Sequence, residues 1–167
     1  MLRNRHWMFV VFLIFCAAFA RLIPHAPNFT PVLSLALFAG SAFENKKLSF
    51  LVPIIAMLLS DALIGFHELV PVIYLSMLLI VLLGFITKRN FKSVALMSTI
   101  ASVLFFVLSN IAVWAFTSYY PKNVTGLSAC FIAAIPFFAH TLISAYVYSA
   151  ILFGALAINA QRSRVFA

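Results

Sequence analysis

The sequence predicts an all-α membrane protein, a single integral membrane domain over residues 1–167 with six transmembrane helices and both termini in the cytoplasm. Hydrophobic residues make up 65% of the chain and charged residues only 8%. The mean hydropathy is +1.15, which is far above that of soluble globular domains. The apolar residues form long runs, and Lys and Arg gather in alternate segments between them, as in multi-pass helical proteins.

The predicted helices cover about residues 7–22, 31–43, 48–65, 70–87, 93–116 and 136–158. The first ends near Ile23, within segment 21–31 (RLIPHAPNFTP), because the prolines of this segment disfavour helix. The second is expected to begin with Thr30 as N-cap and Pro31 in its first turn. It is short for a bilayer that needs about 20 residues, so either the preceding segment dips into the membrane or neighbouring helices shield it. Pro136 is expected to divide the last apolar stretch, leaving residues 127–135 as a separate outer segment.

Lys and Arg predict the orientation. Nine of the 11 lie in segments that include both chain ends: Arg3, Arg5, Lys46, Lys47, Lys88, Arg89, Lys92, Arg162 and Arg164. Only Arg21 and Lys122 fall in the other set. This bias predicts that both chain ends lie in the cytoplasm, and it explains the net charge of +8 without nucleic acid. An alternative is that residues 3–20 form a cleavable signal peptide, which would leave five helices.

The strongly polar residues are predicted to lie in the outer third of the bundle. At 1.5 Å per residue, Asp61 lies about 20 Å and Asn110 about 25 Å above the cytoplasmic end of their helices. The candidate substrate-binding residues at this level are Arg21, His25, Asn28, Asp61, His67, Asn110, Trp114, Tyr120 and His140. Everything below them is expected to be apolar. This layering predicts a cup that opens to the outside and has a closed floor.

Asp61 is the most informative of these residues, because an intramembrane carboxylate is costly unless it is paired or hydrated. Its expected partner is Arg21, with His25 or His67 as second choices. Two interpretations stay open: an ion pair that only fixes the structure, or one that also serves the ligand. The N-terminus of the second helix is expected to direct its free N–H groups and partial positive charge at the same cup.

The other candidates also have alternatives. His25, His67 and His140 with a carboxylate would suit a transition metal, but they come from separate segments, so we expect hydrogen bonding and no metal or other cofactor. Trp114 and Tyr120 fit either an aromatic belt at the membrane surface or a wall on which a planar ligand stacks. No catalytic motif such as G-x-S-x-G, H-E-x-x-H or a P-loop occurs, so catalytic residues are not predicted.

Several motifs resemble a family of uncharacterised bacterial membrane proteins. They are RLIPHAPNFTP at 21–31, ALFAG at 36–40, SD at 60–61 with GFH at 65–67, SNIAVW at 109–114, YPK at 120–122 with GL at 126–127, and AIPFF at 134–138. That family is predicted to be similar to the substrate-binding (S) components of energy-coupling factor transporters. The chain departs from the family pattern at His140, where the family has Asn, and at 144–145, where it has Gly-Asp instead of Ser-Ala.

This resemblance implies an S-component-like bundle of six helices that captures a small nutrient, either a vitamin-like molecule or a metal ion, near the outer face. It also implies a transmembrane coupling subunit with two ATPases as partners, beside the lipid bilayer. Docking would use small residues, here Cys16, Ala20, Ala36 and Gly40. The alternatives are a stand-alone secondary carrier and an intramembrane enzyme that acts on a lipid-like substrate.

Overall fold

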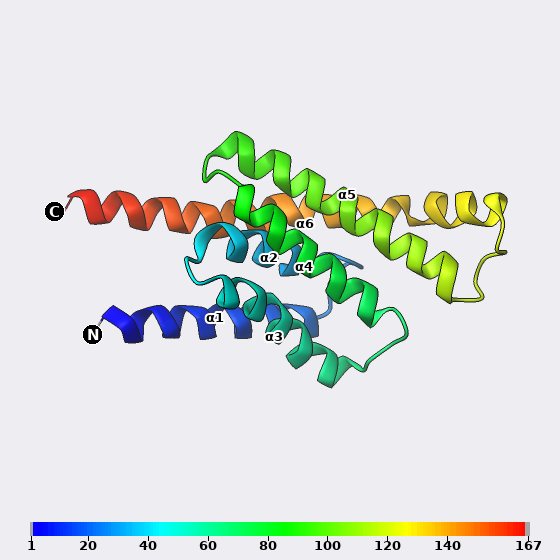
Figure 1. Cartoon of the computed structure of the whole chain (residues 1–167), viewed down its shortest axis with the longest axis horizontal. Coiled ribbons are helices and arrows are strands. Elements are labelled where there is room, and N and C mark those ends of the chain that lie inside the picture. Colours follow the sequence, from blue (N-terminus) through cyan, green and yellow to red (C-terminus); the bar gives the residue numbers. More distant parts are fainter. Residues whose placement is uncertain (1, 166–167) are drawn as a thin grey trace.

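The computed structural model describes residues 2–165, and it describes the side chains of residues 8–158. This part of the chain contains six α-helices and no strand (Figure 1). The helices are α1 (Leu2–Leu22), α2 (Val32–Ala42), α3 (Lys46–Ile64), α4 (Val70–Ile86), α5 (Phe91–Phe116) and α6 (Val124–Val165). The predicted all-helical class is confirmed.

Three helical segments are long and apolar enough to cross a membrane: Lys46–Ile64, Phe91–Phe116 and Val124–Ile158. The segments Met8–Leu22, Val32–Ala42 and Val70–Ile86 are also apolar but shorter. Exposed large hydrophobic side chains, such as Phe12, Phe15 and Phe19 on α1, cover the outside of the bundle. A surface of this kind belongs in lipid rather than in water.

The short helix α2 lies at the centre of the bundle and packs against all five other helices (Figure 1). Residues 31–40 are all buried. Of the two explanations that the sequence left open for its length, the structure supports shielding by neighbouring helices. A helix enclosed on all sides has no need to match the thickness of the bilayer itself.

Two glycines allow α2 and α4 to approach closely. A Cβ atom added at Gly40 would lie 2.2 Å from the carbonyl oxygen of Val81, and one added at Gly84 would lie 2.5 Å from the carbonyl oxygen of Leu37. Ala36, one turn before Gly40, is fully buried. The predicted docking role of Ala36 and Gly40 therefore does not fit the structure, because these small residues are used inside the bundle.

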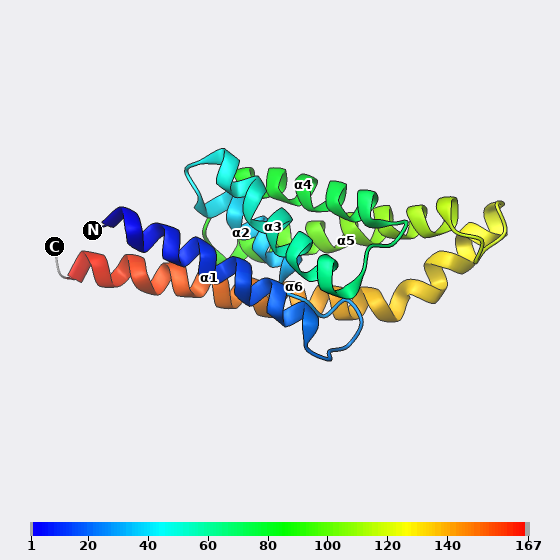
Figure 2. The same ribbon diagram turned by 90° about the horizontal axis from the view of Figure 1, so that it is seen from below.

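Helix α6 corrects the prediction of a division at Pro136. It runs continuously for 42 residues with Pro136 inside it, a length of about 60 Å. Figure 2 shows that it changes direction in its yellow-orange part instead of breaking. Proline removes one intrahelical hydrogen bond, and membrane helices tolerate that loss by bending.

The start of α2 also differs from the prediction. Pro31 is the N-cap in a helical conformation, and no side chain caps the helix, so Thr30 does not have the expected role. The backbone N–H of Thr30 donates instead to the carbonyl of Asn28 at 3.0 Å. The backbone turns at Asn28, where φ is +63°, and this turn leads the chain into α2.

Candidate functional site

An ion pair joins the end of α1 to α3. Nη2 of Arg21 lies 2.7 Å from Oδ1 of Asp61, and the two side chains are 17% and 3% exposed. The predicted partnership of Arg21 and Asp61 is thus confirmed. Both groups have little contact with water in these apolar surroundings. Each charge is therefore stabilised mainly by the other.

Further groups complete this network. The Tyr74 hydroxyl, on α4, donates to Oδ2 of Asp61 at 2.8 Å, so both carboxylate oxygens are engaged. Nη1 of Arg21 donates to the Ser60 hydroxyl at 2.6 Å and lies 3.0 Å from the sulfur of Met57. Sequence reasoning missed Tyr74, although the single phenol of a largely apolar helix, one turn from its first residue, was a usable signal.

The loop between α1 and α2 places Asn28 in the left-handed region, which asparagine tolerates better than most residues. Its carbonyl accepts from the Thr30 N–H at 3.0 Å and lies 3.4 Å from the Ser144 hydroxyl of α6, whose shorter hydrogen bond is to the Thr141 carbonyl at 2.9 Å. Its side-chain amide makes no hydrogen bond within the described part of the chain. His25, in the same loop, is exposed, and its Nδ1 lies 2.6 Å from the carbonyl oxygen of Ile23.

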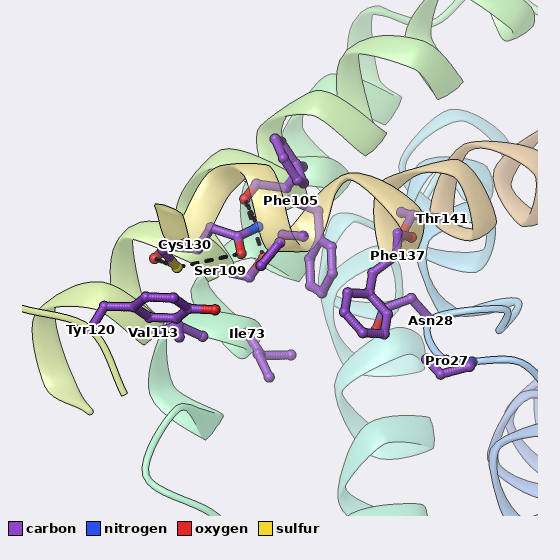
Figure 3. A pocket seen from close by; sticks show the side chains of 14 residues that line it. Pro27, Asn28, Ile73, Phe105, Ser109, Val113, Tyr120, Cys130, Phe137 and Thr141 are labelled. Atoms are coloured by element: carbon purple, nitrogen blue, oxygen red, sulfur yellow. Dashed lines mark hydrogen bonds between the residues drawn. The ribbon is translucent and has the colours of Figure 1, made fainter. Parts of the chain in front are cut away.

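A cavity of about 360 Å³ lies between this loop and helices α4, α5 and α6 (Figure 3). It reaches the protein surface at the exposed residues Pro27 and Asn28. Its lining is Pro27, Asn28, Ile73, Phe105, Phe106, Ser109, Asn110, Val113, Tyr120, Cys130, Ala133, Ala134, Phe137 and Thr141. Of the nine predicted binding residues, the structure brings Asn28, Asn110 and Tyr120 together here.

Asn110 and Tyr120 keep hydrogen-bonding capacity for a ligand. Nδ2 of Asn110 donates to the Phe106 carbonyl of its own helix at 2.7 Å, while Oδ1 has only the distant thiol of Cys130, at 3.9 Å. One N–H of this amide and most of the accepting capacity of Oδ1 are therefore left over. The Tyr120 hydroxyl has no partner among the described residues, and Figure 3 shows it pointing away from its own loop toward the cavity.

Trp114 lies outside the cavity lining and stabilises the α5–α6 turn. Its Nε1 donates to the carbonyl of Pro121 at 2.9 Å. The ammonium group of Lys122 donates to the carbonyls of Trp114 and Thr117, and Gly126 packs so tightly that a Cβ there would lie 2.0 Å from the Pro121 oxygen. Pro121 and Lys122 of the YPK motif and Gly126 of the GL motif thus have a structural role in this turn, whereas Tyr120 lines the cavity.

The three histidines of the predicted binding set, His25, His67 and His140, do not converge. His67 is exposed in the α3–α4 loop, where its Nδ1 accepts from the Leu69 N–H at 3.3 Å. It lines an open pocket of about 850 Å³ with Glu68 and Lys122. His140 lines neither pocket, and its buried Nδ1 has no hydrogen-bond partner. Among the described residues, no three His, Cys, Asp or Glu side chains are grouped closely enough to hold a metal ion.

The layer below the cavity is not wholly apolar, contrary to the prediction. The Ser98 hydroxyl of α5 donates to that of Ser149 at 3.0 Å, which donates to that of Ser34 at 3.1 Å. The Ser34 hydroxyl donates to the carbonyl of Ala145 at 2.9 Å. All three serines are buried, so this chain of hydroxyls ties α5, α6 and α2 together.

The sequence of the chain matches one known family. A family model, "Family of unknown function (DUF6580)", matches residues 1–166. The chain belongs to DUF6580. No curated protein and no solved structure matches it significantly. The DUF6580 match spans the ion pair, the α1–α2 loop and the cavity alike.

Proposed function

We propose that this DUF6580 chain is a substrate-capture subunit, similar to the S components of energy-coupling factor transporters, that binds a small nutrient within the membrane. The observation that carries the proposal is the cavity of about 360 Å³ with free polar groups on Asn28, Asn110 and Tyr120. Its size is within the range of small-molecule sites. The apolar wall with a few polar groups is also typical of such sites.

We further propose that all six helices cross a bacterial inner membrane and that both termini are cytoplasmic. The start of α1 and the end of α6 lie at the same end of the bundle (Figure 1), together with Lys46 at the start of α3 and with the α4–α5 loop that carries Lys88 and Arg89. The α1–α2, α3–α4 and α5–α6 loops lie toward the other end. The positive-inside rule then assigns the cavity to the outer half of the membrane.

The energy for uptake would come from partner proteins. The sequence contains no P-loop, so ATP hydrolysis is assigned to two ATPases that act through a transmembrane coupling subunit. Because Ala36 and Gly40 are buried, the candidate docking surface consists of the remaining small residues on α1, where Cys16 is exposed and Ala20 is partly exposed.

The alternatives lack a specific supporting observation. An intramembrane enzyme would need Asp61 as a free acid or base, but Arg21 and Tyr74 occupy both of its oxygens. A secondary carrier coupled to protons would need ionisable groups beside the substrate. The cavity lining contains no Asp, Glu, Lys, Arg or His.

The test is mass spectrometry of small molecules retained by the purified protein. Ala133→Phe adds a ring at the cavity wall, whereas the control Ala129→Phe adds the same ring to an exposed position one turn away that does not line the cavity. We expect a retained molecule in the wild type and the control, and its loss in Ala133→Phe. Equal retention in both variants, or no retained molecule in the wild type, would refute the proposal.

A further inference from the structure

The cavity is electrically neutral in a chain whose net charge is +8. None of the 14 described residues that line it is Asp, Glu, Lys, Arg or His. Its polar groups are the two amides, the phenol of Tyr120, the thiol of Cys130 and the hydroxyls of Ser109 and Thr141. This selection of groups limits what can be bound there.

Charges elsewhere in the bundle do not compensate for this neutrality. Arg21 and Asp61 do not line the cavity and are already paired with each other. Lys122 is held by carbonyl oxygens in the α5–α6 turn. Contrary to the sequence-based expectation, no residue of α2 lines the cavity either, so its N-terminal N–H groups do not face the site. A charged ligand would thus be desolvated without a counter-charge, at a high cost.

The free groups favour a particular neutral partner. The Asn110 amide presents an acceptor and one N–H side by side, a pattern complementary to the edge of another amide. The Ser109 and Thr141 hydroxyls donate within their own helices, at 3.3 and 2.9 Å, so toward the cavity they can only accept. Aromatic rings from Phe105, Phe106 and Phe137 form the wall, against which a flat ring can stack.

We propose that the cavity takes an uncharged, planar molecule with an amide-like edge, and that it rejects carboxylates, organic cations and metal ions. This proposal rests on the proposed function and narrows it, because vitamin-like nutrients include anions and cations as well as neutral compounds. It also removes the metal ion from the substrate classes that the sequence left open.

Three probes of nearly equal shape test the charge preference: benzamide is neutral, benzoate is an anion and benzamidine is a cation. Binding is measured by ligand-observed NMR on the full chain in nanodiscs, with Ala133→Phe to subtract partition into lipid. We expect benzamide to bind the wild type about tenfold or more tightly than either ion. Asn110→Asp should reverse the order in favour of benzamidine, and Asn28→Asp, at an exposed position, does the same if Asn110→Asp fails to fold.

The proposal is overturned if benzoate or benzamidine binds the wild type as tightly as benzamide and Ala133→Phe abolishes that binding. It is also overturned if none of the three probes binds. Neither result touches the proposed function, which depends on whether the purified wild type retains a molecule that Ala133→Phe loses. The two proposals can therefore fail separately.

Discussion

Replacing Asp61 by alanine should lower the free energy of unfolding by about 3–5 kcal/mol, because the change breaks a buried ion pair from one side. The Arg21 guanidinium would lose a carboxylate 2.7 Å away while its side chain stays only 17% exposed. The Tyr74 hydroxyl would lose its acceptor at 2.8 Å. These two stranded donors, rather than the small volume removed, account for most of the expected loss.

Two comparison variants separate these contributions. Tyr74→Phe removes one hydrogen bond to a charged group and should cost about 1.5–3 kcal/mol. Replacing Asp61 by leucine and Arg21 by methionine together removes both charges, and it should recover most of the stability lost in Asp61→Ala. The recovery is expected because an apolar pair of similar volume is tolerated where an unpaired charge is not.

Unfolding during SDS titration in mixed micelles, followed by circular dichroism, gives the free energies. A double-mutant cycle on Arg21 and Asp61 then gives the coupling between the two side chains. If the coupling is close to zero, or if Asp61→Ala costs no more than Tyr74→Phe, the two charges do not depend on each other. That result would refute the reasoning.

Three more predictions follow from the packing and the topology. Gly40→Ala should lower the free energy of unfolding by about 1–3 kcal/mol, because its Cβ would lie 2.2 Å from a carbonyl oxygen of α4. Gly154→Ala is the control and should leave the free energy of unfolding unchanged, because a Cβ at this position has no atom within 4 Å. Ser149→Ala should cost about 1–3 kcal/mol, because it leaves the buried Ser98 hydroxyl without its acceptor and removes the donor to Ser34, whose own hydroxyl still donates to Ala145; an unchanged unfolding midpoint would contradict this. In intact cells, after replacement of the native cysteines, an impermeant thiol reagent should label Ser118→Cys but not Lys88→Cys, and the reverse pattern would overturn the topology.

The ion pair could be predicted from the sequence because the expected depth of each charged residue in the membrane almost determines which residues can pair. Only one carboxylate falls inside an apolar run, and counting residues from the predicted cytoplasmic end of its helix puts Asp61 level with the end of the first helix. A buried charge must find a partner, and Arg21 is the nearest cation at that level. Asn110 was predicted as a ligand contact on a similar ground, because an amide in an apolar helix needs partners. Asn28 was predicted because it lies in the polar, proline-rich segment at the same level.

The hydroxyl chain could not be predicted in the same way. A serine in a helix can always donate to a carbonyl of its own preceding turn, as Ser102 does to Ser98 at 2.8 Å. The sequence therefore does not say which serines bond across helices. That choice depends on the register of α2, α5 and α6, which only the packed structure defines.

Small residues posed a related problem. The spacing of Ala36 and Gly40 correctly indicates a surface for close helix approach, but it does not say whether the approaching helix belongs to the same chain. In the structure that helix is α4, whose Gly84 meets Gly40 at the contact. The prediction that Pro136 divides the last helix was wrong because proline can either kink a helix or end it, depending on the surrounding residues. In α6 the helix continues through Pro136 with a kink.

The α1–α2 loop connects the ion pair to the cavity, and the two features have different roles. Arg21, at one end of the loop, is fixed to α3 by Asp61, and Pro31, at the other end, is buried at the start of α2. Asn28 lies between these fixed ends with its carbonyl 3.4 Å from the Ser144 hydroxyl and its side-chain amide without a partner among the described residues. If the cavity retains a ligand as we propose, loss of Asp61 should weaken that retention indirectly, by loosening the loop, whereas substitutions at Asn110 should weaken it while the loop stays anchored. On this proposal the ion pair supports the loop beside the cavity, and the cavity lining itself contains no charged side chain, so a buried carboxylate in the bundle is compatible with a neutral site.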